Sequence, residues 1–278
     1  MITAKRAALG LVRAILLLLF LGFAVAPLCW IIVTSLKNTK EIYTFPLLYF
    51  PSQPTLESYH RLFSFAKFGL YFRNSLVVSV LAAAGALIVS LVGGFGLSRY
   101  TAERGKRLIL LGLYFTQMVP GFLLMVPLFN MLSALRLTDS LWVLAAVYGM
   151  MVAFGTIMAK SFFDRIPPSI EEAALIDGCS TLQALFRVIL PVTLPGIVAI
   201  FSFSFVNIWN ELFLAVMLLS SESNVVVPVA LNSFISKAGV SWDVLSAGIV
   251  VSLLPTIIVF SVGQKFIIAG LTEGSVKG

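Results

Sequence analysis

Long uncharged stretches constrain this chain more than any other feature of its sequence. No charged side chain occurs between Arg13 and Lys37, and five further apolar stretches of similar length follow. A helix needs about 20 apolar residues to cross a bilayer, and lipid offers no hydrogen-bond partners to free backbone groups. The stretches are too long and too evenly apolar for the strands of a membrane barrel. We therefore predict an all-α, polytopic membrane protein.

The predicted spans are six, and charged or proline-rich segments separate them. They lie at about residues 13–37, 74–98, 107–136, 140–159, 194–219 and 244–264, and the fifth contains one acid, Glu211. We expect the first span to be retained rather than cleaved as a signal peptide, because its uncharged run is too long for a typical signal h-region and no clear A-x-A site closes it. The composition agrees, since 59% of the residues are hydrophobic and only 11% are charged, whereas soluble domains carry about 25% charged residues.

The basic residues predict the orientation in the membrane. An even number of spans places both termini on one side. Twelve of the 19 Lys and Arg residues then fall at the termini and in the loops after the second and fourth spans. Because cytoplasmic loops are enriched in Lys and Arg, we expect both termini to be cytoplasmic. The same distribution accounts for the net charge of +7 without a nucleic-acid-binding face, which would gather the basic residues on one polar domain.

We expect a single membrane permease domain over residues 1–278. Its parts are a first span (1–36), an external segment (37–73), the core spans (74–268) with a cytoplasmic loop (161–193), and a C-terminal tail (269–278). In the external segment, Thr55 is expected to cap a short helix with Glu57 in its first turn. Cys29 and Cys179 form neither a disulfide framework nor a metal-ligand spacing, so no metal site is predicted.

The most specific pattern is the loop that joins the fourth and fifth spans, "SFFDRIPPSIEEAALIDGCSTLQALFRVILPVTLP" (161–195). Two prolines end the incoming helix. Ser169 is expected to cap a short helix, with Glu172 at the spacing of a capping box. Gly178 should end this helix, since glycine is favoured just past a helix C-terminus.

A second short helix is expected after the glycine, capped by Ser180 or Thr181. Two short helices joined at a glycine indicate a rigid cytoplasmic docking element, which would pass a partner's movement to the spans better than a flexible loop. A surface hairpin without any partner is the alternative that the pattern leaves open.

The segment "EAALIDGCSTLQALFRVILPVTLPG" (172–196) resembles the "EAA" signature of permeases of ATP-binding-cassette importers. That signature has Glu-Ala-Ala, three residues, Gly, about nine residues and Ile-x-Leu-Pro. Here Val188 replaces the isoleucine, and Cys179 replaces a small residue such as alanine. The resemblance implies that this loop is the coupling helix that fits a cleft on the ATPase subunit. The residues implied to couple are Glu171, Glu172, Ala173, Ala174, Asp177, Gly178, Leu190 and Pro191.

The resemblance covers nearly the whole chain and points to the carbohydrate branch of the family. The segments that carry it include "SLKNTKEIYTFP" from Ser35, "FRNSLVVS" from Phe72, "NIWNELFLA" from Asn207 and "GLTEGSVKG" from Gly270. In the maltose-type branch this chain would be the shorter of two permeases. The resemblance therefore implies a heterodimer with a second permease, two ATPase subunits and an extracellular solute-binding protein, in the cell (inner) membrane of a bacterium or archaeon.

The chain carries no motif for hydrolysing ATP. A P-loop reads G-x-x-x-x-G-K-[ST], and Gly105-Lys106 lacks both the upstream glycine and the following Ser or Thr. Neither H-E-x-x-H nor G-x-S-x-G occurs. We therefore expect a protein that is not an enzyme and binds no cofactor, with ATP and Mg²⁺ held by the partner ATPase.

A polar cluster in the fifth span is the candidate contact for a transported solute. Glu211 is the one acid deep in an apolar span, and such charges usually face a cavity or a partner. Ser204, Asn207 and Glu211 share one face of a helix by their spacing. Glu211 could contact a sugar, could pair with a basic or amide group to hold helices together, or could act in gating. The candidate pathway residues are Ser204, Asn207, Trp209, Asn210 and Glu211, with Gln117 and Asn130 beside the proline-rich third span.

Three other functions compete with sugar import. A secondary transporter driven by an ion gradient would show inverted repeats and a charged relay at the midplane, and neither is evident. An importer permease for another small polar solute would keep the coupling loop but change the cargo. A signalling or scaffold membrane protein would use the loop to dock a partner without transport.

Overall fold

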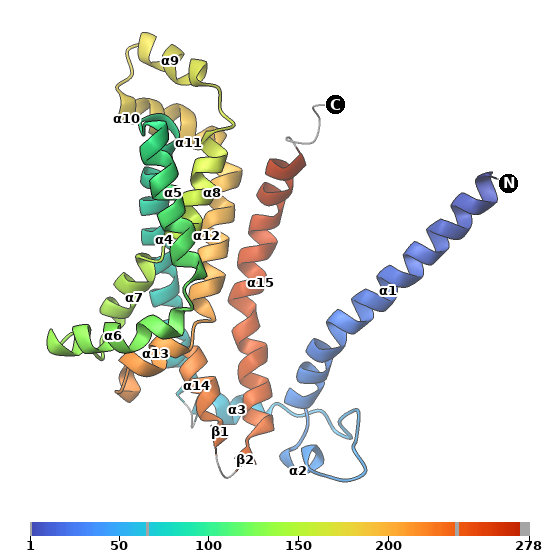
Figure 1. Cartoon of the computed structure of the whole chain (residues 1–278). Coiled ribbons are helices and arrows are strands. Elements are labelled where there is room, and N and C mark those ends of the chain that lie inside the picture. Colours follow the sequence, from blue (N-terminus) through green and yellow to red (C-terminus); the bar gives the residue numbers. More distant parts are fainter. Residues whose placement is uncertain (1, 65–66, 237–238, 273–278) are drawn as a thin grey trace. The chain divides into compact units, whose positions relative to one another are not determined.

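The computed structural model of the chain describes residues 2–64, 67–236 and 239–272 and is shown in Figure 1. The predicted tail (269–278) lies partly outside the described residues. Lys237, one of the basic residues counted for the orientation, lies outside them as well. The described residues are almost entirely helical. One short antiparallel pair occurs among them, β1 (Ile235–Ser236) with β2 (Gly239–Val240). The predicted all-α class is confirmed apart from this small ladder.

Contacts divide the chain into two compact units, which we describe separately. The first comprises Met1–Gly69 and Leu231–Leu254, and the second comprises Leu70–Ala230 and Pro255–Gly278. The first unit contains α1 (Ile2–Ser35), α2 (Thr39–Ile42), α3 (Glu57–Ser64) and the first turns of α15 (Trp242–Thr272). The long helices α4 (Phe68–Arg99) and α15 and the short helix α14 (Val227–Ser233) run from one unit into the other.

A buried acid holds the first unit together. Asp243 is 2% exposed in the first turn of α15, where a carboxylate is favoured by the helix dipole. It accepts a hydrogen bond of 2.8 Å from the Thr39 hydroxyl and forms an ion pair with Arg61 of α3. The backbone N–H of Glu57 donates to the Thr55 hydroxyl at 3.2 Å. The short helix predicted in the external segment is therefore confirmed, with Thr55 beside its start.

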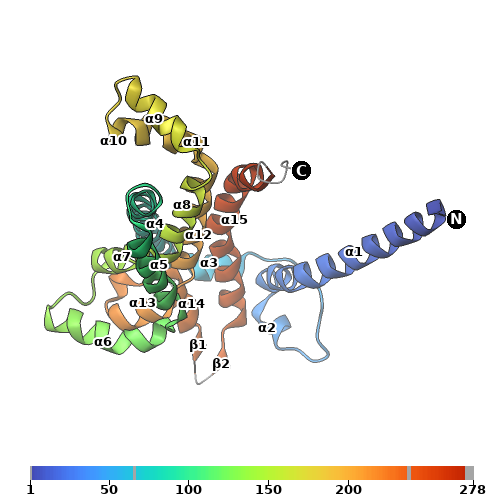
Figure 2. The ribbon, with the colours of Figure 1, turned by 45° about the horizontal axis from the view of Figure 1, so that its top comes forward.

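The second unit is a bundle of helices with a hairpin at one end. Figures 1 and 2 both show α4, α5, α8 and α12 side by side, with α9, α10 and α11 at one end of them. Its remaining elements are α5 (Glu103–Met118), α6 (Gly121–Ala134), α7 (Leu141–Gly149), α8 (Ala153–Phe163), α9 (Pro168–Ile176), α10 (Thr181–Ala184), η1 (Leu185–Ile189), α11 (Leu190–Val192), α12 (Leu194–Trp209), α13 (Phe213–Leu218) and η2 (Glu222–Asn224).

Small residues let α4 and α8 approach closely. A Cβ atom added at Gly94 would lie 2.6 Å from the Ala159 Cβ and 2.7 Å from the Lys160 nitrogen. One added at Gly155 would lie 2.4 Å from the Ser90 hydroxyl oxygen. Close backbone approach through small residues is a common way for membrane helices to pack. A buried apolar cluster continues this contact, with Phe95, Phe163, Ile189 and Ile200 among its members.

Three described helices are long and apolar enough to cross a membrane: Gly10–Ser35, Phe68–Arg99 and Trp242–Phe266. Three bent pairs also qualify if each pair counts as one crossing, so the described residues hold three to six candidate spans. The pairs are Glu103–Met118 with Gly121–Ala134 (94°), Leu141–Gly149 with Ala153–Phe163 (43°) and Thr181–Val192 with Leu194–Trp209 (81°). The chain is therefore a multi-pass membrane protein.

The predicted third and fifth spans are less regular than their apolar runs suggest. The third breaks at Pro120, which has no backbone N–H and stands at the start of α6. The fifth was expected to continue to Leu219. Instead α12 ends at Trp209, and a separate short helix begins at Phe213.

Candidate functional site

The first helix of the hairpin between α8 and α12 begins two residues earlier than the sequence predicts. Pro167 is the N-cap of α9 and Pro168 is its first residue, so the expected cap at Ser169 is wrong. Proline suits the first helical position because its fixed φ matches the helix and its missing N–H would be unpaired there anyway. This is why the second proline starts the helix instead of only ending the previous one.

The turn of the hairpin follows the prediction. Gly178 has a φ of +86°, a left-handed conformation that favours glycine. Its N–H donates to the Leu175 carbonyl at 3.1 Å. Ser180 then caps α10 through a capping box with Gln183, in which each side chain bonds the other's backbone N–H at 3.3 and 2.9 Å. Of the two caps that the sequence left open, Ser180 is the one used.

A π-helical turn links the hairpin to the bundle. It covers Leu185–Ile189, and the N–H of Leu190 donates to the carbonyl of Leu185, five residues back. Pro191 follows and has no N–H to continue a regular α-helical ladder. Single π-helical turns of this kind frequently occur at functional sites.

Arg99 fixes the hairpin to the bundle. This last residue of α4 bonds Glu171 of α9 with its Nε at 3.1 Å. Its Nη2 donates to the carbonyls of Phe163 and Ile166 at 3.0 and 2.9 Å. A guanidinium fork suits such multiple bonding, and a cation is favoured at the C-terminus of α8. One side chain therefore joins α4, α8 and α9.

Both oxygens of the Glu171 carboxylate are occupied. Tyr100 donates its hydroxyl hydrogen to the second oxygen at 3.0 Å, and Glu171 is 7% exposed. Partial burial and the nearby Glu171 carboxylate raise the pKa of the Tyr100 hydroxyl, which keeps it protonated as a donor. Glu171 was predicted to couple, but Arg99 and Tyr100 were missed. Arg99 stands 72 residues away in the chain, and no local pattern marks such a partner.

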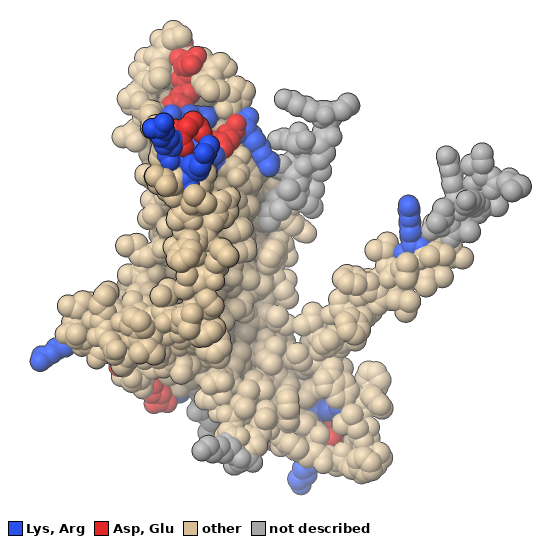
Figure 3. Space-filling model, viewed as in Figure 1, with Lys and Arg blue, Asp and Glu red and all other residues tan. Residues whose placement is uncertain are grey.

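A second polar contact joins α4 and α8 near the hairpin. Asp164 accepts from the Ser98 hydroxyl at 2.6 Å and from the Lys160 ammonium at 2.5 Å. Partial burial opposes ionisation of Asp164, but these two hydrogen bonds outweigh it and hold the pKa of this carboxyl below its usual value. Figure 3 shows charged side chains of both signs gathered at this end of the second unit, above a flank that is almost free of charge.

The hairpin exposes large apolar side chains as well as charged ones. Ile176 is 85% exposed, Leu182 66% and Phe186 63%. Large exposed apolar side chains are typical of an interaction site where they form one patch. The predicted coupling residues divide accordingly. Glu171 and Ala174 are buried against the bundle and Leu190 is half-buried, whereas Glu172, Ala173, Asp177, Gly178 and Pro191 are exposed.

A cavity of about 240 Å³ in the second unit contains three of the predicted pathway residues. Ser204, Asn207 and Glu211 line it together, as their spacing predicts. Aromatic and small side chains complete the wall, which is formed by Ala86, Tyr148, Met151, Phe154, Gly155, Phe203 and Ile208 in addition to those three. The rings of Phe154 and Phe203 stack with their centroids 4.0 Å apart.

Glu211 lies just beyond α12, in the break before α13. Its carboxylate accepts from the Tyr148 hydroxyl at 2.5 Å and from the Leu214 N–H at 3.1 and 3.2 Å. The carboxylate thus caps α13 and joins it to α7. In the described part of the chain no Lys or Arg forms a salt bridge with it. Its structural partners are a tyrosine and a backbone group instead of the basic or amide group considered from the sequence.

The other predicted pathway residues lie elsewhere. Trp209 packs away from the 240 Å³ cavity, against Phe205 and Phe72 with ring centroids 5.8 and 5.5 Å apart. Asn210 donates to the Val206 carbonyl at 2.7 Å. Gln117 on α5 and Asn130 on α6 are exposed and do not line this cavity. In the described residues, no three His, Cys, Asp or Glu side chains come close enough together to hold a metal ion.

These features define a class: a multi-pass helical membrane protein with a helical hairpin at one end of its bundle and a cavity whose wall includes polar side chains. Residues 90–272 match the family described as "Binding-protein-dependent transport system inner membrane component", and this range includes both the hairpin and nearly all of the cavity wall. The chain belongs to this family and is a permease of an ABC transporter, which is not itself an enzyme.

Relatives that match nearly the whole chain are also permeases of transport systems. The inner membrane ABC transporter permease protein YcjP of Escherichia coli is 37% identical over 94% of this chain and 94% of its own length. The sulfoquinovosyl glycerol transport system permease protein SmoH of Agrobacterium fabrum is 34% identical over 91% of this chain and 88% of its own length. The trehalose transport system permease protein SugB of Mycobacterium tuberculosis is 31% identical over 95% of this chain and 97% of its own length.

A solved structure shares the fold. A chain of a bacterial ABC transporter involved in the import of the acidic polysaccharide alginate superposes with a TM-score of 0.81 at 26% identity. The match covers 95% of this chain and 98% of that chain. The helix arrangement described above is therefore that of an ABC importer permease.

Proposed function

We propose that this chain forms half of the membrane pathway of an ATP-driven importer for a sugar or oligosaccharide. The observation that carries the proposal is the hairpin α9–α11, which is fixed to the bundle by Arg99 and Glu171 and exposes Ile176, Leu182 and Phe186. Relatives named for glycosides, trehalose and alginate support a carbohydrate cargo. A permease for another small polar solute is the alternative.

The proposed topology has six crossings with both termini in the cytoplasm. Each bent helix pair would then act as one crossing. The hairpin would lie in the cytoplasm, in keeping with the charged side chains gathered at its end of the second unit (Figure 3) and with the enrichment of basic residues in cytoplasmic loops. The cell would be a bacterium or archaeon, and the chain would lie in its cell (inner) membrane.

The proposed partners follow from the hairpin and from the family description. Two ATPase subunits would bind ATP and Mg²⁺, and one of them would receive Ile176, Leu182 and Phe186 in a cleft. A second permease would complete the pathway as a heterodimer. An extracellular solute-binding protein would deliver the cargo, as the words "binding-protein-dependent" in the family description suggest.

The cavity beside Glu211 is the proposed cargo contact within this chain. Hydroxyl and amide groups of Ser204 and Asn207 suit sugar hydroxyls, and the stacked Phe154 and Phe203 offer an apolar surface to a ring face. Trp209, Asn210, Gln117 and Asn130 stay predictions for the assembled complex.

The test is the ATPase activity of the reconstituted complex. The chain is co-expressed with its neighbouring permease and ATPase, and the solute-binding protein is added with a panel of mono- and oligosaccharides. We expect stimulation by one loaded binding protein. Gly178→Pro should abolish it, because proline cannot adopt a φ of +86°, while membrane insertion stays intact.

A conservative variant separates coupling from folding. Gly178→Asn should keep most of the stimulation, since asparagine tolerates the left-handed conformation and a Cβ at this position meets nothing within 4 Å. Full stimulation of the Gly178→Pro complex would contradict the proposed role of the hairpin. Stimulation only by a binding protein loaded with a non-sugar solute would contradict the carbohydrate cargo and favour the alternative, a permease for another small polar solute.

A further inference from the structure

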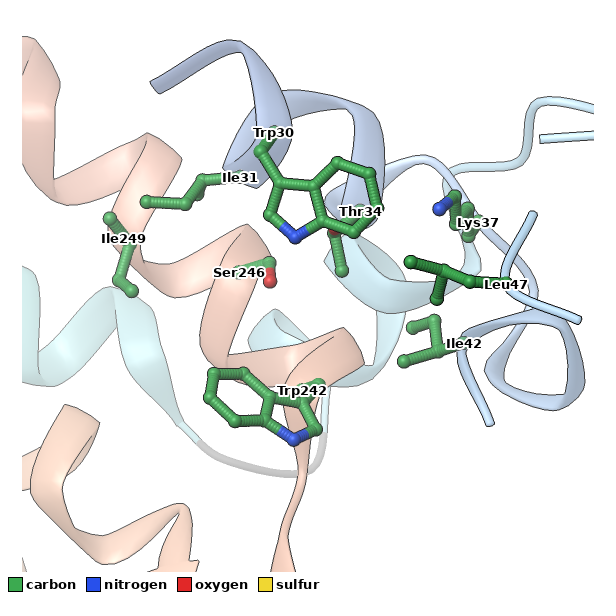
Figure 4. Close-up of a pocket in the computed structure, with 9 residues that line it drawn as sticks. All are labelled: Trp30, Ile31, Thr34, Lys37, Ile42, Leu47, Trp242, Ser246 and Ile249. Carbon is green, nitrogen blue, oxygen red and sulfur yellow. The ribbon is translucent and has the colours of Figure 1, made fainter. Parts of the chain in front are cut away.

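A second cavity, of about 270 Å³, lies in the first unit where α1 ends and α15 begins (Figure 4). It is remote in sequence from the coupling hairpin and from Glu211. Its wall combines the last turns of α1, the first turns of α15 and the connection through α2. The lining residues are Trp30, Ile31, Thr34, Lys37, Ile42, Leu47, Trp242, Ser246 and Ile249.

The cavity is apolar with a few polar groups. Figure 4 shows the indole rings of Trp30 and Trp242 on opposite sides, with the Ser246 hydroxyl between them. Thr34 is 7% exposed, and its hydroxyl oxygen is buried without a hydrogen-bond partner. A buried hydroxyl without a partner costs free energy, so a ligand with a polar group beside an apolar body would complete this wall.

Lys37 adds a buried positive charge. It is 2% exposed, its ammonium donates to the Leu48 carbonyl at 2.5 Å, and it lies 4.5 Å from the centre of the Trp30 ring. Among the described residues no carboxylate forms a salt bridge with it. Desolvation lowers the pKa of this ammonium, and nearby Glu41 opposes the shift only in part. A ligand with an anionic group would add a direct ion pair, which Glu41 does not form with this ammonium in the described residues.

The cavity stands at the ends of two candidate spans. Gly10–Ser35 ends beside it and Trp242–Phe266 begins beside it, and tryptophan and tyrosine gather where membrane helices meet water. The neighbouring segment is aromatic and exposed: Tyr49 is 69% and Phe50 75% exposed, and Tyr49 meets Trp30 edge to face at 6.1 Å. Aromatic residues at the ends of two candidate spans place this cavity, by that rule, near the level of the lipid headgroups.

We propose that this cavity binds an anionic phospholipid of the surrounding bilayer, with an acyl chain between the two indoles and the phosphate at Lys37. The bilayer is the abundant source of such a molecule at this level. A free fatty acid has the same chemistry of an apolar chain and an anionic head, and the experiment distinguishes the two. The proposal requires only that α1 and α15 cross the membrane, and it is independent of the cargo.

The test measures lipids retained by the full chain. The protein is reconstituted in nanodiscs with equal phosphatidylglycerol and phosphatidylcholine, extracted in mild detergent and analysed by native mass spectrometry. We expect one retained phosphatidylglycerol, favoured over phosphatidylcholine about fivefold, the effect of one basic residue near a charged membrane surface. Lys37→Met should remove the preference, and Lys37→Arg should keep it.

Variants of the cavity wall make the test independent of folding. Trp242→Ala should lower retention severalfold, whereas Trp142→Ala is the matched control, because Trp142 is 71% exposed on α7 and outside this cavity. Ser246→Leu should fill the cavity and displace the lipid while Lys37 keeps its bond to Leu48. Thermal unfolding of each variant in detergent confirms that it is folded.

Three outcomes would overturn the proposal. Equal retention by the wild type, Trp242→Ala and Trp142→Ala would show that only loosely surrounding lipid is carried along. Equal retention of the two lipids by the wild type would show that the cavity does not recognise an anionic headgroup. In a parallel reconstitution to which oleate is added, retention of oleate without phosphatidylglycerol would assign the site to a free fatty acid. None of these measurements involves ATPase stimulation, so this proposal and the proposed function fail separately.

Discussion

Arg99 bonds one carboxylate, two carbonyls and the Ser98 hydroxyl, so its replacement leaves four acceptors behind. Its side chain is 11% exposed and that of Glu171 is 9%. Breaking a buried charge pair from one side costs about 3–5 kcal/mol. We expect Arg99→Met to lower the free energy of unfolding by a smaller amount, about 2 kcal/mol, since this end of the bundle faces water.

Arg99→Met should lower the stimulated ATPase activity more strongly than it lowers the stability of the fold. Arg99→Met is expected to reduce binding-protein-stimulated ATPase activity about tenfold or more, because α9 loses its bond to α4, and one mispositioned contact can cost about 100-fold in rate. Arg104→Met is the matched control, since Arg104 is exposed and nearby. Equal activity of the two variants would refute the positioning role of Arg99.

Asp139 gives the chain a pH-dependent contact outside the spans. Its carboxylate bonds the Ser221 hydroxyl, the N–H groups of Ser220 and Ser221 at 2.9 and 3.0 Å, and Asn224. The Ser221 hydroxyl and backbone bonds are the main causes that hold the pKa of this carboxyl far below its usual value. The folded pKa is depressed, so the stabilisation is present above the unfolded value of about 3.9 and is lost as the pH falls through the folded value.

The prediction concerns Asp139→Asn. At pH 7 this variant should unfold more easily than the wild type, by no more than about 1 kcal/mol because the group is screened by solvent. The difference should narrow below about pH 4. Thermal unfolding in detergent between pH 3 and 7 checks this, and a difference that stays constant would contradict it.

Local signals explain which residues were predictable. Gly178 and Ser180 sit in short-range turn and cap patterns, and both were identified from the sequence. Arg99 was counted only as a charge that sets topology, because its partner Glu171 comes from another helix. The cavity that Lys37 and Trp242 both line was likewise not predicted, since it depends on how the ends of α1 and α15 meet.

At the scale of elements, α4 and α8 touch through glycines. Gly94→Ala would force its new Cβ against Ala159 and the Lys160 backbone. Overpacking of this kind costs about 1–3 kcal/mol, and we expect a corresponding loss of thermal stability.

The neighbouring glycine provides the control for this prediction. A Cβ at Gly96 meets nothing within 4 Å, so Gly96→Ala should be neutral or slightly stabilising, because alanine is the better helix former. If both variants unfolded at the same temperature, close packing of α4 on α8 would not be the reason for the glycine at position 94.

The presence of the long helices was predicted better than the positions of helix ends. Uncharged apolar runs located the long helices α1, α4 and α15, since lipid demands such runs. The end of α12 at Trp209 was missed because neither Gly nor Pro marks it. There the Glu211 carboxylate takes the N–H of Leu214 and starts a new helix, a tertiary arrangement that also depends on Tyr148.

At the scale of the whole molecule, topology is the prediction to measure. In a background with Cys29→Ser and Cys179→Ser, we expect a membrane-impermeant maleimide to label Ser52→Cys in intact cells but Thr181→Cys only after permeabilisation. Both positions are exposed in the structure, so accessibility depends on the side of the membrane. Labelling of Thr181→Cys in intact cells would reverse the orientation and separate the hairpin from any cytoplasmic ATPase.

The π-helical turn at Leu185–Ile189 has a consequence for rotational phase. An α-helix advances by about 100° per residue, and this turn accommodates one residue more than a regular helix would. A chain shorter by one residue here would rotate Phe186 and the apolar face of α10 by about a quarter of a circle relative to α11. The same surface would then point at a different part of the partner. A one-residue deletion in this turn is thus expected to change how the hairpin meets the proposed ATPase without changing any residue of α10.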